Sequence, residues 1–167
     1  MLVLNRLSVA QSIDSLLHQA RQKKEGRLIK GGRGYNLWVQ QAGEGKTKLL
    51  VLPGGPGDSH RGYEPFRQLL PQHDIQVFIL DMVDCGLSDR TQNPAYWSLA
   101  TFVEDVEDVR SALGLEHFFL LGHSFGGMVA FEYAAAHPER LQGLLMSNMT
   151  DTFEGLGANI ELFADSL

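Results

Sequence analysis

Strand-length apolar runs alternate with helix-length segments through most of this 167-residue chain. A strand followed by a helix and another strand usually makes a right-handed crossover, so this order predicts a mostly parallel α/β sheet. The runs are apolar along their whole length, as expected for strands that helices cover on both faces. The expected strands are 27–30, 35–41, 48–52, 75–80, 117–121 and 141–147, and the expected helices are 63–70, 99–113 and 125–136.

The pattern G-x-S-x-G, formed by Gly122-His123-Ser124-Phe125-Gly126, stands between an expected strand and an expected helix. In a nucleophile elbow this pattern serves a tight strand-to-helix turn, in which the glycines relieve crowding and the serine Oγ is exposed. The helix N-terminus behind the serine favours developing negative charge. We therefore expect Ser124 to be a nucleophile, and the alternative is an ordinary glycine-rich turn.

A second loop, Pro53-Gly54-Gly55-Pro56-Gly57, follows the expected strand 48–52. Glycines let the main chain approach closely and proline fixes its path, so this loop can point backbone N–H groups above the serine. An oxyanion formed there would be bound by the N–H groups of Gly55 and of Phe125, the residue after the nucleophile. An ordinary turn is again the alternative.

Two further segments carry a family resemblance. Residues 54–60 have the sequence GGPGDSH, and residues 81–89 have the sequence DMVDCGLSD. They are similar to the H-G-G-P-G-x-S-H and D-Q-x-G-C-G-x-S-D loops of the proline iminopeptidases, which are serine α/β-hydrolases, and the elbow resembles theirs as well. Pro53 and residues 82–84 depart from these patterns. The resemblance implies the N-terminal part of the α/β-hydrolase fold, with strands 1 to 6 of its sheet.

The chain divides into three expected parts. Residues 1–25 show a helical spacing of apolar side chains and indicate an N-terminal helical appendage, while residues 26–150 hold the sheet. Proline iminopeptidases insert a helical cap after the sixth strand, and its acidic residues recognise the free amino group of the substrate. The resemblance makes residues 151–167 the start of such a cap, with the remaining cap and the last strands outside the chain. Strand 141–147 would then be a sheet edge through which copies of the chain could associate.

A complete catalytic triad is not expected within the chain. In serine hydrolases of this fold, the order along the chain is Ser, then Asp or Glu, then His. The one histidine after Ser124 is His137, which would lie at the far end of the same helix, roughly 20 Å away. It is expected to interact with the last carbonyls of that helix. Asp151 occupies a position from which some α/β-hydrolases supply the acid, but it fits a cap or turn role better.

Gly54, His60 and His123 are the candidate substrate-binding residues. His60 belongs to the loop that would supply an oxyanion donor, and His123 precedes the nucleophile but should point away from it. Purely structural roles for both histidines are the alternative. Cys85 is expected to be a packed small residue, since the sequence places no base beside it.

Composition argues against several classes of partner. The net charge of -6 is spread without the basic cluster that nucleic-acid binding needs. No apolar run approaches the roughly 18 residues of a membrane span, and residues 1–21 do not resemble a secretory leader. The single cysteine cannot form an internal disulfide, so we expect a cytoplasmic location. Neither a metal nor a cofactor is expected.

Three hypotheses remain open at this point. The first is a serine hydrolase of the proline iminopeptidase type, which releases an N-terminal residue, typically proline, from small peptides through an acyl-enzyme on Ser124. In that case this chain would be truncated and inactive alone. The second is another α/β-hydrolase, such as an esterase or a carbon–carbon hydrolase. The third is a non-catalytic remnant or interaction protein.

Overall fold

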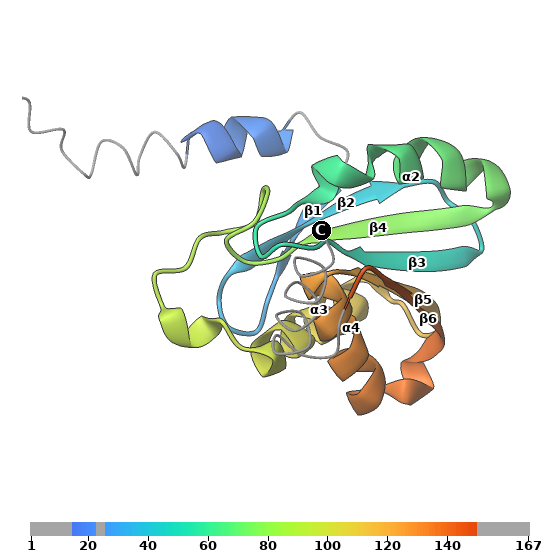
Figure 1. Ribbon diagram of the computed structural model, residues 1–167. Coiled ribbons are helices and arrows are strands. Elements are labelled where there is room, and N and C mark those ends of the chain that lie inside the picture. The colour runs from blue at the N-terminus through green and yellow to red at the C-terminus, as the bar shows by residue number, and fades with distance from the viewer. Residues whose placement is uncertain (1–14, 23–25, 150–167) are drawn as a thin grey trace, which may run out of the picture.

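A six-stranded sheet organises the computed structural model, which describes residues 15–22 and 26–149. Helix α2 lies on one face of the sheet, and α3 and α4 lie on the other (Figure 1). The strands are β1 (Gly26–Lys30), β2 (Asn36–Ala42), β3 (Thr47–Leu52), β4 (Ile75–Asp81), β5 (Phe118–His123) and β6 (Leu141–Ser147). The helices are α2 (Glu64–Leu69), α3 (Leu99–Leu113) and α4 (Phe125–Ala136), with short 3-10 turns η1 (His60–Tyr63), η2 (Leu70–His73), η3 (Pro94–Tyr96) and η4 (Pro138–Arg140).

The strand order is β1-β2-β4-β3-β5-β6. Strands β4, β3, β5 and β6 are parallel, whereas β2 pairs antiparallel with both β1 and β4. The carboxyl ends of β3 and β5 therefore meet at the same edge of the sheet, which brings the two glycine-rich loops together. The predicted mostly parallel α/β sheet is confirmed, and β1 and β6 are its two edges.

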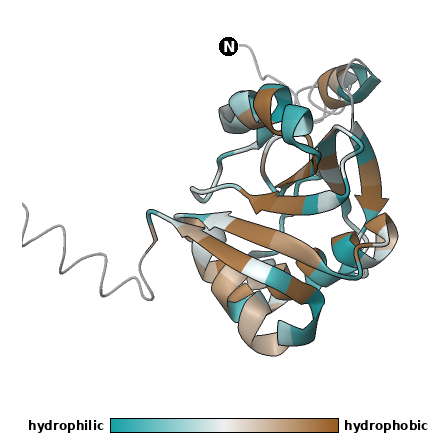
Figure 2. Ribbon diagram, turned by 90° about the vertical axis from the view of Figure 1, so that its right-hand side faces the viewer, coloured by the Kyte–Doolittle hydropathy of each residue, from teal (hydrophilic) through white to brown (hydrophobic). Residues whose placement is uncertain are grey.

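Two apolar cores lie on opposite faces of the sheet. Residues Leu50 and Leu52 of β3 face α3 and α4, whereas Leu49 and Val51 face the α2 side. This alternation follows from the two-residue repeat of a strand. Figure 2 shows hydrophobic residues along the strands, as predicted for strands covered on both faces. The larger core lies on the side of α3 and α4, and the elbow between β5 and α4 begins above it.

The described part of the N-terminal segment, residues 15–22, is helical and contacts the loop that follows β4. Arg21 donates from Nε to the carbonyl of Leu87 and from Nη2 to Asp89 Oδ1, each at 2.8 Å. Asp89 also accepts from the backbone N–H of Asn36. The rest of the expected appendage and the whole expected cap start, 151–167, lie outside the described residues, as does Asp151. Within 15–22 and 26–149, no helix is long and apolar enough to cross a membrane.

Candidate active site

Ser124 occupies the turn between β5 and α4 with a backbone conformation that L residues rarely adopt. Its φ is 50° and its ψ is -119°, and such a conformation costs about 1–3 kcal/mol unless the surroundings enforce it. Two hydrogen bonds enforce it here: Ser124 N–H donates to the carbonyl of Ser147, and Gly127 N–H donates to the carbonyl of Ser124, both at 2.9 Å. The predicted strained turn is confirmed.

The glycines of the elbow are required by packing. A Cβ added to Gly122 would lie 2.5 Å from the carbonyl oxygen of Gly126, and one added to Gly126 would lie 2.2 Å from the carbonyl oxygen of Leu52. Helix α4 therefore touches the end of β3 backbone to backbone. This contact fixes the N-terminus of α4, and with it the N–H of Phe125, directly behind Ser124.

The loop after β3 lies against the elbow. A Cβ added to Gly54 would be 3.1 Å from Ser124 Cβ and 3.0 Å from His123 Cδ2, so only glycine fits without displacement. Gly55 has a φ of 113°, which turns the chain sharply at the next residue. The structure thus brings Gly54, Gly55, Ser124 and Phe125 together, although they come from two loops far apart in the sequence.

Tyr63 lies beside this loop, a position that the sequence did not reveal. Its ring is buried and makes an edge-to-face contact with Phe66, with ring centroids 5.6 Å apart. Burial and the charge of Asp58 together raise the pKa of Tyr63 to about 12, and the backbone of Gly54 partly opposes this rise. Tyr63 therefore remains a neutral phenol. The signal available in the sequence was an aromatic residue a few positions after the glycine loop, but nothing there indicated where its hydroxyl would point.

His60 lies inside the protein and not on the wall of the cavity beside the elbow. Its side chain is 2% exposed, its Nδ1 is 2.7 Å from Asp81 Oδ2, and its backbone N–H donates to Asp81 Oδ1 at 2.6 Å. Asp81 Oδ2 also accepts from the N–H of Leu87 at 2.8 Å. The His60 ring thus lies between the loop after β3 and the end of β4, and its assignment as a substrate-binding residue stays a prediction.

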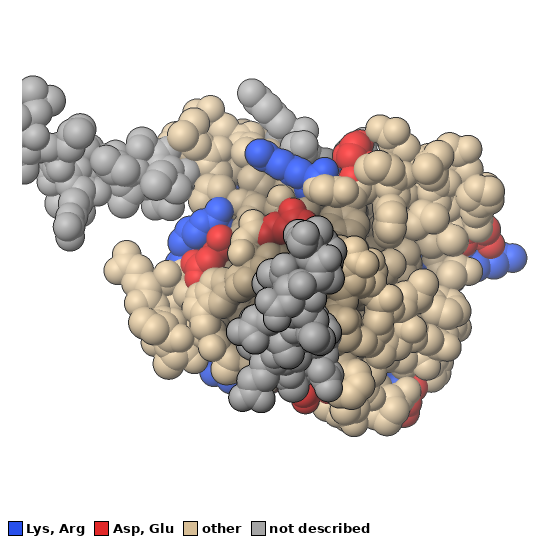
Figure 3. Space-filling view, viewed as in Figure 1, with Lys and Arg blue, Asp and Glu red and all other residues tan. Residues whose placement is uncertain are grey.

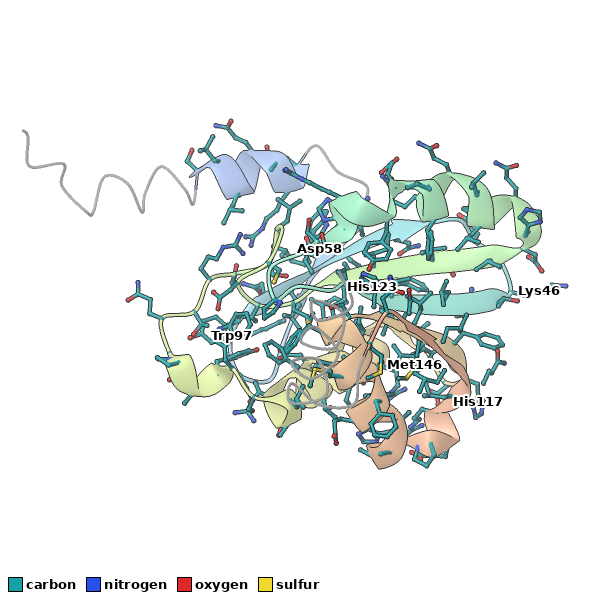
Figure 4. All side chains as sticks on the ribbon, viewed as in Figure 1. Lys46, Asp58, Trp97, His117, His123 and Met146 are labelled. Carbon is teal, nitrogen blue, oxygen red and sulfur yellow. The ribbon has the colours of Figure 1, made fainter. Side chains whose placement is uncertain are left out.

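His123 lines a cavity of about 290 Å³ at the carboxyl end of β5. Its Nδ1 is 3.2 Å from Ser147 Oγ, so the ring points toward β6. Asp58, which is labelled together with His123 in Figure 4, lines the same cavity. The cavity is lined by Asp58, Gly62, Tyr63, Phe66, Leu121, His123 and Ser147.

The other titratable candidates are His137 and Cys85. His137 follows the last residue of α4, where its N–H donates to the carbonyl of Tyr133 at 2.8 Å. Cys85 is buried, and burial raises the pKa of its thiol. The described residues contain no group of His, Cys, Asp and Glu side chains that could hold a metal ion. On the face shown in Figure 3, basic side chains lie singly and form no continuous basic surface.

A mostly parallel sheet with a strained serine between a strand and a helix defines the class of protein. The family model for the alpha/beta hydrolase fold matches residues 48–165. The chain therefore belongs to the α/β-hydrolase fold family.

Within that family, the resemblance to the proline iminopeptidases is confirmed. The proline iminopeptidase of Chitinophaga pinensis is 38% identical over 72% of this chain and 42% of its own length. That of Flavobacterium johnsoniae is 33% identical over 69% of this chain and 40% of its own length. The crystal structure of the Mycobacterium smegmatis proline iminopeptidase has a TM-score of 0.78 at 30% identity, covering 85% of this chain and 50% of that one. The chain thus spans half or less of the length of these relatives.

Proposed function

We propose that Ser124 is the nucleophile of a serine hydrolase of the proline iminopeptidase type, which releases an N-terminal residue, typically proline, from small peptides. The observation that carries this proposal is the strained turn at Ser124, with a φ of 50°. The turn packs against Gly54, where an added Cβ would lie 3.1 Å from Ser124 Cβ. Strain of this kind persists at functional sites, where it holds a reactive group in place. The proline iminopeptidase relatives supply the substrate class.

The geometry supports acyl transfer in two steps. Ser124 Oγ attacks the carbonyl carbon of the substrate's first residue, and the oxyanion is bound by the N–H groups of Phe125 and Gly55. Phe125 is the first residue of α4, so its N–H has no partner within the helix. Collapse of the intermediate expels the rest of the peptide as an amine and leaves an ester on Ser124. Water then attacks the ester, releases the amino acid and restores the hydroxyl.

The general base is proposed to come from outside the described residues. Nδ1 of His60 faces Asp81, Nδ1 of His123 faces Ser147, and His137 lies at the other end of α4. A serine hydroxyl is a weak nucleophile at neutral pH until a positioned base accepts its proton. We therefore propose that these 167 residues are inactive by themselves.

A hybrid protein tests the proposed function. It joins residues 1–149 of this chain to the portion of the Chitinophaga pinensis proline iminopeptidase that follows the counterpart of Met149. We expect the hybrid to hydrolyse proline arylamides, and Ser124→Ala to lower kcat by about 10⁴-fold or more. If turnover survived the Ser124→Ala substitution, the assignment of Ser124 as the nucleophile would be refuted. If the hybrid hydrolysed a short-chain aryl ester but no proline arylamide, the proposed prolyl substrate would be refuted.

A further inference from the structure

Asp84 holds a backbone conformation that residues with a Cβ rarely adopt. Its φ is 68°, and it stands where the loop pattern D-Q-x-G-C-G-x-S-D has its first glycine. Aspartate tolerates this region better than most residues, but glycine adopts it with less strain. Such strain persists only where the surroundings enforce it, and it concentrates at functional sites. The Asp84 side chain must therefore supply contacts that glycine cannot.

The carboxylate of Asp84 binds two points of the segment that leads to α3. Its Oδ1 accepts from the N–H of Thr91 at 2.7 Å, and its Oδ2 accepts from Nε1 of Trp97 at 2.9 Å. Trp97, labelled in Figure 4, directly precedes Ser98, the N-cap of α3. The indole is 40% exposed, so it has room to change rotamer unless its polar edge is held. The bond to Asp84 therefore fixes the plane of the Trp97 ring.

Three aromatic rings meet the buried ring of Phe102 on α3. Trp97 and Phe125 contact Phe102 edge to face, with centroid distances of 5.3 Å and 5.6 Å. Tyr96 makes the third contact at 6.2 Å, and its hydroxyl donates to the carboxylate of Asp105 at 2.8 Å. A carboxylate thus holds the polar atom of each outer ring, and the central ring packs on Phe125, the expected oxyanion donor.

We propose that Asp84 is a positioning residue, which acts through the rings of Trp97 and Phe102 to hold Phe125 and the N-terminus of α4 in place for oxyanion binding. Phe125 is the first residue of α4 and is 8% exposed, so the direction of its N–H follows the packing of its ring. Glycine at position 84 would relieve the backbone and leave the indole unheld. The inference deepens the proposed function, and its catalytic part rests on that function.

Stabilisation of the loop alone is a less fitting role for the Asp84 carboxylate. The loop has other hydrogen bonds: the backbone N–H of Asp84 donates to the carbonyl of Asp89 at 3.0 Å. Arg90 Nη1 donates to the carbonyls of Cys85 and Ser88, at 3.1 Å and 2.9 Å. These bonds do not use the Asp84 side chain, so they should hold residues 84–90 when the carboxylate is removed. A substitution at Asp84 should therefore act on the Trp97 ring without unfolding the loop.

The kinetic test uses the hybrid protein described above. Asp84→Gly should lower kcat for a proline arylamide about 5- to 20-fold and leave KM nearly unchanged, because an oxyanion donor acts in the transition state. The matched control is Asp74→Gly. Asp74 also has a positive φ, 59°, and its Oδ1 accepts from the N–H of Lys46 at 3.1 Å, but it precedes β4 at the opposite end of the sheet. This control should leave kcat unchanged.

A double substitution tests whether Asp84 acts through Trp97. Trp97→Phe keeps an aromatic ring but removes the Nε1 donor that Asp84 binds. It should lower kcat in the same direction as Asp84→Gly, and the combination should cost little more than either change alone, because both remove the same interaction. Losses in kcat that simply multiply would show that Asp84 acts without Trp97 and would overturn the proposal.

The 167-residue chain itself gives two measurements that need no catalysis. Its two tryptophans are Trp38, which is 2% exposed, and Trp97, and the Trp97→Phe variant isolates the fluorescence of each. Asp84→Gly should lower the fluorescence anisotropy of Trp97 and speed hydrogen exchange at the amides of residues 125–131, whereas Asp74→Gly should change neither.

Several results would overturn the inference. These are unchanged anisotropy and exchange in Asp84→Gly, equal losses of kcat in the two Asp→Gly variants, or a change in KM without a change in kcat. A hybrid without any turnover would refute the proposed function alone. The anisotropy and exchange of the 167-residue chain would then still decide whether Asp84 holds the rings and the start of α4.

Discussion

At the scale of single residues, the backbone of Ser124 is the most constrained feature of the site. Its φ of 50° and ψ of -119° suit glycine far better than any residue with a Cβ. Ser124→Gly should therefore be more stable than Ser124→Ala by about 1 kcal/mol. Urea unfolding of the two variants measures the difference. Equal stability would mean that the elbow relaxes to ordinary backbone angles in solution.

Asp105 makes stability depend on pH. Its carboxylate is 1% exposed and accepts from the Tyr96 hydroxyl at 2.8 Å, and burial raises its pKa to about 6. Because the folded pKa exceeds the unfolded one, its contribution to stability is full below about pH 4 and is lost as pH rises toward 6. The loss is about 3 kcal/mol for a shift of this size. The Asp105→Asn substitution should remove this pH-dependent loss of stability. Urea unfolding of the original chain and of the variant at pH 4, 5, 6 and 7 measures the difference. The same pH dependence in both proteins would contradict the assignment to Asp105.

At the scale of elements, the contact between α4 and β3 determines where the elbow stands. Gly126→Ala would place a methyl group 2.2 Å from the Leu52 carbonyl oxygen, so α4 must move away from β3. We expect the free energy of unfolding to fall by about 3 kcal/mol or more, as at other overpacked sites. Gly114→Ala is the matched control: Gly114 ends α3 with a φ of 67° and nothing within 4 Å of an added Cβ. The Gly114→Ala variant should lose only about 1 kcal/mol of stability, because alanine is strained at this backbone angle. Similar losses for both would show that α4 does not depend on this contact.

At the scale of the whole molecule, the chain by itself should be a weak or inactive hydrolase. Serine enzymes without their triad retain only about 10³- to 10⁴-fold acceleration over water. The assay is purified chain against proline and alanine arylamides and an aryl ester, with Ser124→Ala as the control. Robust Ser124-dependent turnover by a pure monomer would contradict this expectation. It would point to His60, whose Nδ1 already faces Asp81, as the base.

The apolar groove of about 510 Å³ that Phe119, Leu121 and Leu145 line should also affect how the chain behaves in solution. Exposed apolar surface of this extent favours association. We expect concentration-dependent self-association of the chain. It should be weaker for Leu145→Asp, which changes a residue that lines the groove, than for Leu28→Asp on β1. Sedimentation velocity at several concentrations measures this. A chain that stays monomeric at every concentration would contradict the prediction.

Much of the fold could be predicted from short stretches of the sequence. The expected bounds of α3, α4 and β6 agree with the observed ones, because glycine turns, helix caps and apolar periodicity act between residues near one another in sequence. Ser98 illustrates this: its side chain accepts from the N–H of Thr101 and begins α3. The strained turn at Ser124 was predictable for the same reason, since the glycines that permit it are its neighbours.

The contacts between distant segments were decided by the tertiary structure alone. The order that places β4 between β2 and β3 brings Asp81 beside His60, and the sequence alone did not indicate this buried pair. The approach of Gly54 to Ser124 and the apolar groove lined by Leu121 and Leu145 also depend on how strands pair in space. Local propensity specifies which elements form and where they turn. Burial of their apolar faces against one another then selects the neighbours, and no pattern within a single segment contains that information.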